Sequence, residues 1–328
     1  MIISSVAPPV HTSSIEVQAG DDARMPEEVA ILCSTIIPTI NRPTLTRSVE
    51  SALEQGIDPR RHEIIVVNNS GSPLRKEDWH RSPNVTIVNT NRTKISFTHN
   101  VGAAIAKGKF LHFLHDDDYL LPDSLEALLE VAETSDSVWI YGALNRIDDD
   151  GKFMSVNRLN LKGNIFAYLV AGENIHMGPS LISRQAFFQV GGFNPSLSII
   201  IDLDLEGQLA LFGSFDQVDD VIANIRVGLA GSTTDWSHIR EEYRFFREKM
   251  LNAPGALARM QDSVAGDVFL RGRACRAYAV SSLLNLRGGH VPTSVKRLGS
   301  WAWLASGAIF APQFWRGMAY SWQRAPGT

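Results

Sequence analysis

The sequence predicts an α/β fold built on a mainly parallel sheet. Short apolar runs alternate with amphipathic helical segments over residues 29–134, glycine or proline marks most of the junctions, and no segment repeats. Alternation of this kind places successive strands side by side with right-handed helical crossovers. The 328 residues suffice for one large domain with an appendage, and 44% hydrophobic content with 20% charge is typical of a globular protein.

The first half of the chain supplies this alternation. Apolar runs predict strands at Val29–Ile37, Glu63–Val67, Val85–Val88 and Lys109–Leu114. Apolar residues at helical spacing, with proline or serine at the start, predict helices at Pro43–Gly56, Ser96–Lys107 and Pro122–Thr134.

The pattern changes after residue 137. Extended segments at Val138–Ile147 and Lys152–Val156 flank an Asp-Gly pair, which predicts a hairpin. A short strand at Ser180–Ser183 and a helix at Asp202–Phe212 follow, and the chain is helical in pattern from Ser237, including a long helix at about Val264–Leu286. We therefore expect a flexible tail over residues 1–27, an α/β domain over 28–235 and a basic, tryptophan-rich helical region over 236–328.

Three consecutive aspartates, Asp116, Asp117 and Asp118, follow the strand expected at Lys109–Leu114. They would lie at the carboxyl end of a strand, where open α/β sheets bind ligands. Adjacent carboxylates repel one another unless a cation lies among them, and Mg²⁺ or Mn²⁺ prefers such oxygen ligands and bridges to phosphates. This predicts a metal–diphosphate site in an enzyme acting on a nucleotide-linked substrate; the alternative is an acidic loop that caps a helix.

A second triple aspartate, Asp148–Asp150, precedes Gly151 inside the expected hairpin. Asp-Gly between extended segments is typical of a solvated turn, so we expect no ligand there.

The charge is unevenly distributed. No acidic residue follows Asp267, and the last 61 residues carry eight lysines and arginines, whereas the whole chain has a net charge of −4. Four of the seven tryptophans also lie there: Trp301, Trp303, Trp315 and Trp322. Arginine with tryptophan favours an anionic membrane surface over nucleic acid, and the longest apolar run, Trp301–Ala311, is too short to span a bilayer. A helical appendage that packs its tryptophans on the body is the other interpretation.

The start of the chain and the cysteines indicate the compartment. Met1–Val10 lacks the basic and apolar regions of a signal peptide. Cys33 falls in an expected core strand, which predicts a buried thiol and a reducing compartment. We expect a cytoplasmic protein, with the inner face of the membrane as the place of any peripheral association.

Six segments within residues 29–235 then carry a specific resemblance. They are Ile36–Pro43 (IIPTINRP), Ile64–Gly71 (IIVVNNSG), Thr98–Ala104 (THNVGAA), Leu114–Pro122 (LHDDDYLLP), Gly191–Asn194 (GGFN) and Asp202–Leu205 (DLDL), with Arg226 after them. In this order they resemble the signatures of family 2 glycosyltransferases of the GT-A fold. The C-terminal 90 residues carry none of these motifs.

The resemblance implies an inverting, metal-dependent and non-processive transfer of a sugar from a nucleotide-diphosphate sugar to an acceptor hydroxyl. The acceptor would be a glycan or a lipid-linked precursor in cell-surface polysaccharide synthesis. Asp202 is then the catalytic base, and Asp117 and Asp118 bind Mg²⁺ or Mn²⁺. The residues implied to bind the nucleotide sugar are Pro38, Thr39, Asn41, Arg42, Asn69, Asn100 and Asp116.

The chain departs from the family pattern at several positions. Asn68 and Asn69 replace acids of which one reads the base in uridine-using relatives, His115 replaces the first acid of the metal motif, and Ile201 precedes the base in place of glutamate. Two rival functions stay open: a sugar-nucleotide nucleotidyltransferase and a catalytically silent, nucleotide-sugar-binding relative. The first normally brings a glycine-rich loop after the first strand, and Pro38–Pro43 has no glycine.

Overall fold

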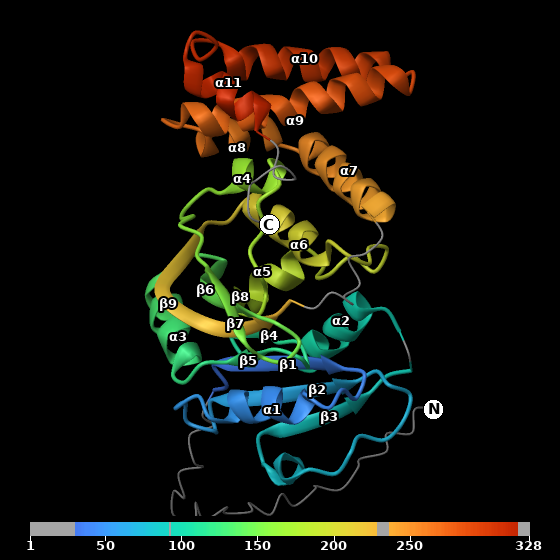
Figure 1. Ribbon diagram of the computed structural model, residues 1–328, viewed down its shortest axis with the longest axis vertical. Helices are drawn as coiled ribbons and strands as arrows, with labels where there is room; N and C mark the ends of the chain where they lie inside the picture. The colour runs from blue at the N-terminus through green and yellow to red at the C-terminus, as the bar shows by residue number, and fades with distance from the viewer. Residues whose placement is uncertain (1–29, 92, 228–235, 321–328) are drawn as a thin grey trace, which may run out of the picture.

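A nine-stranded sheet organises residues 30–91, 93–227 and 236–320, which the computed structural model describes (Figure 1). The strand order is β3-β2-β1-β4-β8-β6-β9-β5, with β7 paired to β6. The tail expected at residues 1–27 lies outside the described residues. The strands are β1 (Cys33–Thr39), β2 (His62–Asn68), β3 (Val85–Asn89), β4 (Phe110–Phe113), β5 (Tyr119–Leu120), β6 (Trp139–Ile147), β7 (Phe153–Asn157), β8 (Ser180–Ser183) and β9 (Phe215–Arg226).

The sheet has a parallel half and a mixed half. β3, β2, β1 and β4 pair in parallel, as the strand–helix alternation predicts. Beyond them β8 is antiparallel to both β4 and β6, whereas β6 and β9 are parallel. The predicted hairpin forms between β6 and β7. A tight hairpin turn can join only antiparallel strands, which is why regular alternation ends there.

Helices cover both faces of the sheet (Figure 1). They are α1 (Leu45–Leu53), α2 (Ile95–Ile105), α3 (Ser124–Thr134), α4 (Phe166–Val170), α5 (Arg184–Gln189), α6 (Ile201–Ala210), α7 (Trp236–Asn252), α8 (Ala256–Ser263), α9 (Val268–Arg287), α10 (Val291–Ala305) and α11 (Pro312–Ala319), with a 3₁₀ helix at Asp78–Arg81.

Successive residues of β1 belong to different cores because strand side chains alternate between the two faces. Ile37 lies in the core formed with α1 and α3. Ile36 lies in the core formed with α2, α4 and the helices beyond α6. On that second face α2 approaches closely, since a Cβ at Gly102 would lie 2.4 Å from Cγ2 of Ile36. The predicted α/β class with a helical C-terminal region is confirmed.

One expected helix begins later than predicted. The prediction of a helix at Val264–Leu286 is wrong at its start, because α8 ends at Ser263 and α9 begins at Val268. Gly266 has a φ of +82°, which ends a helix, and Asp267 caps the next one by accepting the N–H of Leu270 at 2.8 Å.

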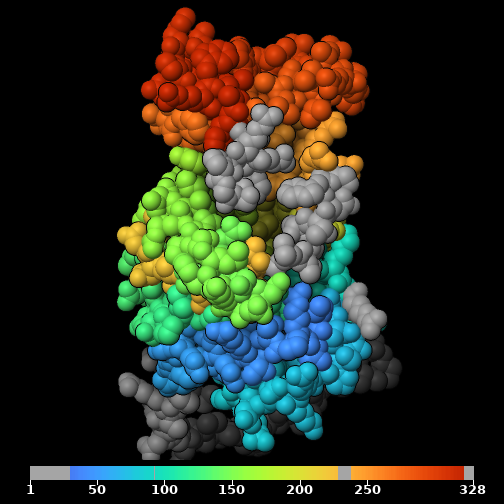
Figure 2. Space-filling view, viewed as in Figure 1, coloured from blue at the N-terminus to red at the C-terminus, as the bar shows by residue number. Residues whose placement is uncertain are grey.

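The helices α7–α11 form the end of the molecule opposite β1–β3 (Figures 1 and 2). α7 packs tightly on α6, where a Cβ at Gly207 would lie 2.5 Å from the ring of Phe246. Cys33 and Cys275 are buried free thiols, as expected for Cys33. Among the described helices, none is both long and apolar enough to cross a bilayer. The division of the chain at residues 27 and 235 stays a prediction.

Candidate active site

A cavity of about 370 Å³ opens where β1, β2 and β4 end. These three strands are parallel neighbours, so their carboxyl ends meet at one edge of the sheet. The loop before α6 closes the opposite side. Seven of the predicted site residues line the cavity: Pro38, Thr39, Arg42, Asn69, Asp116, Asp117 and Asp202.

Asp116 organises the loop that follows β1. Its buried carboxylate accepts the hydroxyl of Thr39 at 2.6 Å and the N–H of Ile40 at 3.2 Å. The guanidinium of Arg42 adds a third contact at 2.9 Å. Three donors to one carboxylate fix the loop against the β4 strand end, so Asp116 shapes the wall of the cavity.

Arg42 joins two of the three acids. One of its terminal nitrogens, Nη1, lies 2.9 Å from both Asp116 Oδ1 and Asp117 Oδ2. The Arg42 side chain is 45% exposed, so it can also reach an anion in the cavity. A guanidinium here offsets the repulsion between neighbouring carboxylates and adds positive charge where a diphosphate would bind.

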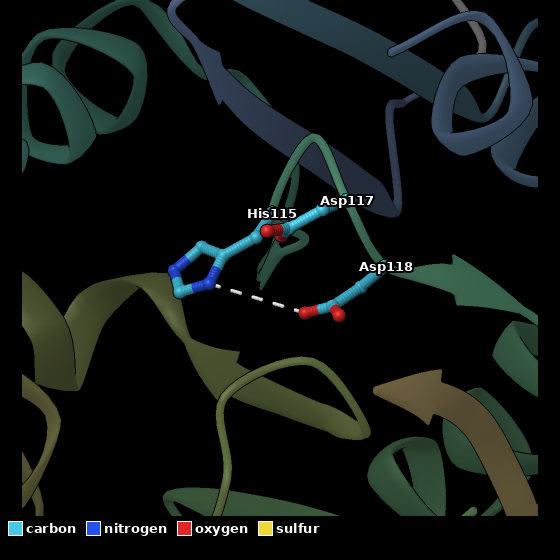
Figure 3. Close-up of side chains that lie close together, drawn as sticks. All are labelled: His115, Asp117 and Asp118. Atoms are coloured by element: carbon cyan, nitrogen blue, oxygen red, sulfur yellow. Dashed lines mark ion pairs between the residues drawn. The ribbon is translucent and has the colours of Figure 1, made fainter. Parts of the chain in front are cut away.

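The candidate metal ligands are His115, Asp117 and Asp118, whose ligand atoms all lie within 4.8 Å of one another (Figure 3). The imidazole Nδ1 of His115 is 3.9 Å from Asp118 Oδ2. Ligands bound about 2.1 Å from a cation lie at most about 4.2 Å apart, so the side chains need to close by a few tenths of an ångström. Two carboxylates and one imidazole suit Mn²⁺ better than Mg²⁺, which binds mostly oxygen ligands.

Asp118 is the most buried member of this group. Its Oδ1 accepts the backbone N–H of Arg226 at 2.8 Å. Burial raises the pKa of Asp118 to about 7, while the nearby His115 opposes the shift. A carboxyl with this pKa is easily neutralised in the metal-free protein, and a bound cation would favour its charged form.

Asp202 lies across the cavity in the first turn of α6. Its Oδ1 accepts the N–H of Leu203 at 2.9 Å. Burial raises the pKa of the Asp202 carboxyl above its ordinary value, and the neighbouring His176 and His115 partly offset this. A raised pKa is the property expected of a general base that works near neutral pH.

Two contacts that sequence reasoning missed hold α6 and its preceding loop in place. The buried carboxylate of Glu242 on α7 accepts the N–H groups of Ser198, Ile199 and Ile200 at 2.8, 2.9 and 3.0 Å. Asp204, fully buried, pairs with Lys249 of α7 at 2.8 Å. Their signal in the sequence was weak, because charged residues on a helix usually face solvent.

Three predicted site residues do not line the cavity. Asn41, which has a φ of +68°, donates its amide to the Pro73 carbonyl at 3.4 Å. Asn100 makes two bonds with the backbone of Phe193, at 2.8 and 3.0 Å, and so clamps the turn at residues 191–194. Asp118 belongs to the candidate metal-ligand group but is buried and does not line the cavity. His115, which the prediction left out as a ligand, lines the cavity instead.

Asn69 lines the cavity, but its amide is engaged. Its Nδ2 donates to the Thr93 carbonyl at 2.8 Å, and its Oδ1 accepts from Thr90 and from the N–H of Thr93. The neighbouring Asn68 binds Ser72 and Asn89. Both asparagines therefore fix loops around the cavity.

The second triple aspartate forms the tip of the β6–β7 hairpin, as predicted. The turn closes through the N–H of Gly151 to the Asp148 carbonyl at 3.0 Å. The Arg226 guanidinium donates to the carbonyls of Asp148 and Asp149, and the Asp149 side chain is exposed. Arg226 thereby ties the hairpin to the loop that carries Asp118.

Comparisons with known proteins agree with this geometry. Residues 34–191 match the family described as glycosyl transferase family 2. The chain contains a family 2 glycosyltransferase domain. An uncharacterized glycosyltransferase of Rickettsia bellii is 28% identical over 161 residues, which are 48% of this chain and 23% of that protein. A chondroitin synthase of Escherichia coli is 26% identical over 197 residues, 59% of this chain and 28% of the synthase. The chain thus spans about a quarter of the length of these two relatives.

A solved structure supports the same fold. Residues 1–349 of S. aureus TarS, crystallised in complex with UDP-GlcNAc, superimpose with a TM-score of 0.60 at 12% identity. The alignment covers 84% of this chain and 92% of that one. The family 2 domain of this chain therefore has the GT-A fold that its motifs predicted.

Proposed function

We propose that the protein is an inverting, metal-dependent and non-processive glycosyltransferase. In this proposal a nucleotide-diphosphate sugar is the donor and the hydroxyl of a glycan or lipid-linked acceptor attacks its anomeric carbon. The proposal is supported by one cavity that has candidate cation ligands on one wall and the half-buried Asp202 carboxylate on the other. The first wall holds His115, Asp117 and Arg42, and Asp202 faces them.

Each wall has its own task in this reaction. Arg42 binds and orients the diphosphate, and His115, Asp117 and Asp118 hold the cation. When bound, a divalent cation neutralises the charge that develops on the departing nucleoside diphosphate. Asp202 takes the proton from the acceptor hydroxyl as it attacks from the opposite face, which contributes about 10²–10⁴-fold to the rate.

The residues of this site do not identify the base of the donor nucleotide. Asn68 and Asn69 stand where relatives carry acids, and both amides are bonded to neighbouring loops. The solved TarS complexes hold UDP and UDP-GlcNAc. UDP sugars are therefore the first donors to assay, followed by GDP and dTDP sugars.

The test is donor turnover with purified protein, with and without Mn²⁺. Release of nucleoside diphosphate only with Mn²⁺ supports the proposal. Asp117→Asn should abolish it, whereas the matched change Asp149→Asn in the hairpin should leave it intact. Release of pyrophosphate from a nucleoside triphosphate and a sugar 1-phosphate would identify a nucleotidyltransferase. Binding of the donor without release of nucleoside diphosphate would identify a silent relative. Equal damage from both substitutions would contradict the metal assignment.

We also propose peripheral association with an anionic membrane on the cytoplasmic side, through α9–α11. Exposed apolar side chains gather on these helices: Leu283, Leu286, Val291, Val295, Leu298, Trp303, Phe310 and Trp315. Part of the basic charge is internal, since Arg297 is buried beside Glu248 and Arg273 pairs with Glu173. Trp301 is partly buried against the core, and Trp322 lies outside the described residues.

This proposal is tested by sedimentation with liposomes that contain phosphatidylglycerol. The full chain should pellet at low salt and be released as salt rises, because exposed charges are screened. A chain that stays in the supernatant at low salt would show that α9–α11 are a structural appendage.

A further inference from the structure

A second cavity, of about 270 Å³, lies among α4, α7 and α9 and shares no lining residue with the cavity that holds Asp117 and Asp202. Five arginines line it, and we call it the arginine pocket. Arg240, Arg244 and Arg247 come from one face of α7, since residues four and three apart share a helix face. Arg273 and Arg276 come from α9. No acidic residue is among the residues that line this pocket.

Four of these arginines, Arg244, Arg247, Arg273 and Arg276, carry the inference, and their contacts in the described structure leave part of their charge uncompensated. Within the described structure, Arg273 has an ion-pair partner, Glu173, at 2.6 Å. Arg276 donates to the Met318 carbonyl at 3.0 Å, which is a neutral acceptor. Arg247 and Arg276 are close enough for each charge to disfavour the other. Such an arrangement is costly unless an anion lies between the guanidiniums.

Arg247 gives the most direct indication of a missing partner. Its Nε is buried without a hydrogen-bond partner in the described structure. Burial lowers the pKa of Arg247; the nearby Glu248 carboxylate opposes this shift, and the charge of Arg276 adds to it. A buried donor that lacks an acceptor costs about 1–3 kcal/mol, so an anion that accepts from it would be bound favourably.

We propose that the arginine pocket binds a phosphate ester. A carboxylate is planar and is satisfied by one guanidinium fork, whereas phosphate presents three or more oxygens in tetrahedral directions. Guanidiniums that approach from two different helices match the second geometry. Val170, Ala277 and Val280 add an apolar wall against which a short carbon chain can lie.

The arginine pocket lies near enough to Asp202, the candidate base, for the charge of Asp202 to act on a residue that lines the pocket. Tyr243 lines the pocket, and its pKa is raised to about 12 by burial and then by the carboxylate of Asp202. The natural source of the phosphate is therefore the acceptor, either as a soluble phosphorylated glycan or as a lipid headgroup. This assignment rests on the proposed glycosyltransferase function, whereas the binding of phosphate does not.

The experiment is calorimetric titration of the full chain with glycerol 3-phosphate in EDTA, which removes divalent cations from the donor site. Arg244→Gln/Arg276→Gln should weaken binding at least 10-fold, about 1.4 kcal/mol. The matched control is Arg287→Gln/Arg316→Gln, which removes two exposed charges from α9 and α11 outside the pocket. It should change the dissociation constant less than about twofold.

Several outcomes would overturn the proposal. They are the absence of binding by the wild-type chain, equal weakening in both variants, and equally tight binding of glucuronate, a carboxylate. If the double variant fails to fold, Arg244→Gln and Arg247→Gln are tested as single variants; Arg244 is exposed, so its substitution should leave the fold intact. Arg244→Gln with unchanged affinity and Arg247→Gln with unchanged affinity would together also refute it.

The source of the phosphate is distinguished by competition. Vesicles of phosphatidylcholine with phosphatidic acid should displace glycerol 3-phosphate if the ligand is a lipid headgroup, and should not if it is a soluble ester. Either result supports the pocket and assigns the source. Asp117→Asn should keep this binding while losing donor turnover, so a failure of the donor site and a failure of the pocket are separable.

Discussion

Substituting Glu242 tests whether α7 positions the candidate base. The Glu242 carboxylate accepts three backbone N–H groups, from Ser198, Ile199 and Ile200. These residues lead directly into α6 and Asp202. Glu242→Gln keeps the shape of the side chain but replaces one carboxylate oxygen with an NH₂ group, which cannot accept a hydrogen bond. We expect a less stable protein with a displaced Asp202.

The magnitude follows from the three bonds. A net hydrogen bond to a charged group contributes about 1.5–3 kcal/mol, and one to a neutral group about 0.5–1.5 kcal/mol. Oε2 accepts the N–H groups of Ile199 and Ile200, and Oε1 accepts that of Ser198. The amide oxygen of glutamine can keep the first two bonds, now to a neutral acceptor, while the bond to Ser198 is lost. The Glu242 side chain is 6% exposed, so water compensates little. The free energy of unfolding should fall by about 3.5–6 kcal/mol.

The assay pairs urea unfolding with turnover. Because a misplacement of about 1 Å in a catalytic group can cost about 10²-fold, kcat of Glu242→Gln should fall by about 10- to 100-fold under conditions where the protein is folded. Glu241→Gln, at the exposed neighbouring position, is the control and should change neither quantity. A folded Glu242→Gln with wild-type kcat would refute the positioning role.

Other predictions concern the base, the metal and the α6–α7 contact. Asp202→Asn should lower kcat by about 10²-fold or more with donor affinity nearly unchanged in equilibrium binding. Because the base acts when deprotonated and burial raises its pKa above 3.8, the acidic limb of the kcat–pH profile should lie above pH 3.8. In the metal-free protein the pKa of Asp118 is about 7, so calorimetry should show Mn²⁺ affinity falling as pH drops below about 7 and levelling off above it. Lys249→Met leaves the buried Asp204 carboxylate unpaired and should lower the free energy of unfolding by about 3 kcal/mol in urea.

The elements best predicted from the sequence are those whose signal is local. β1, β2 and β4 are apolar runs because these strands are covered by helices on both faces, which the sequence shows directly. β9 has no such run, because its first half carries polar residues that are partly or fully exposed, such as Asp216, Asp219 and Asp220. The partners of β8 and β9 depend on contacts between distant segments, which periodicity does not encode.

The candidate site shows the same division. The three acids after β4 could be predicted as a site because they follow a buried strand, whereas the same triplet at Asp148–Asp150 falls in a hairpin turn. Asn100 was predicted to bind the nucleotide, but its amide clamps Phe193, 93 residues away. An asparagine has the same hydrogen-bonding groups in either role, so only the fold decides which partner it meets.

The helix α7 shows why such roles escape a reading of the sequence. Glu242, Phe246 and Lys249 are spaced four and three apart and face α6, whereas Arg244 and Arg247 lie on the face toward the arginine pocket. Ile239, Phe246 and Met250 mark the buried face as apolar, but this periodicity does not show that the buried Glu242 lies among them or which groups it binds. One rigid helix thus holds the loop before Asp202 on one side and the arginine pocket on the other. If the proposed function is correct, α7 holds an acceptor phosphate in the arginine pocket at a fixed position relative to Asp202, the candidate catalytic base.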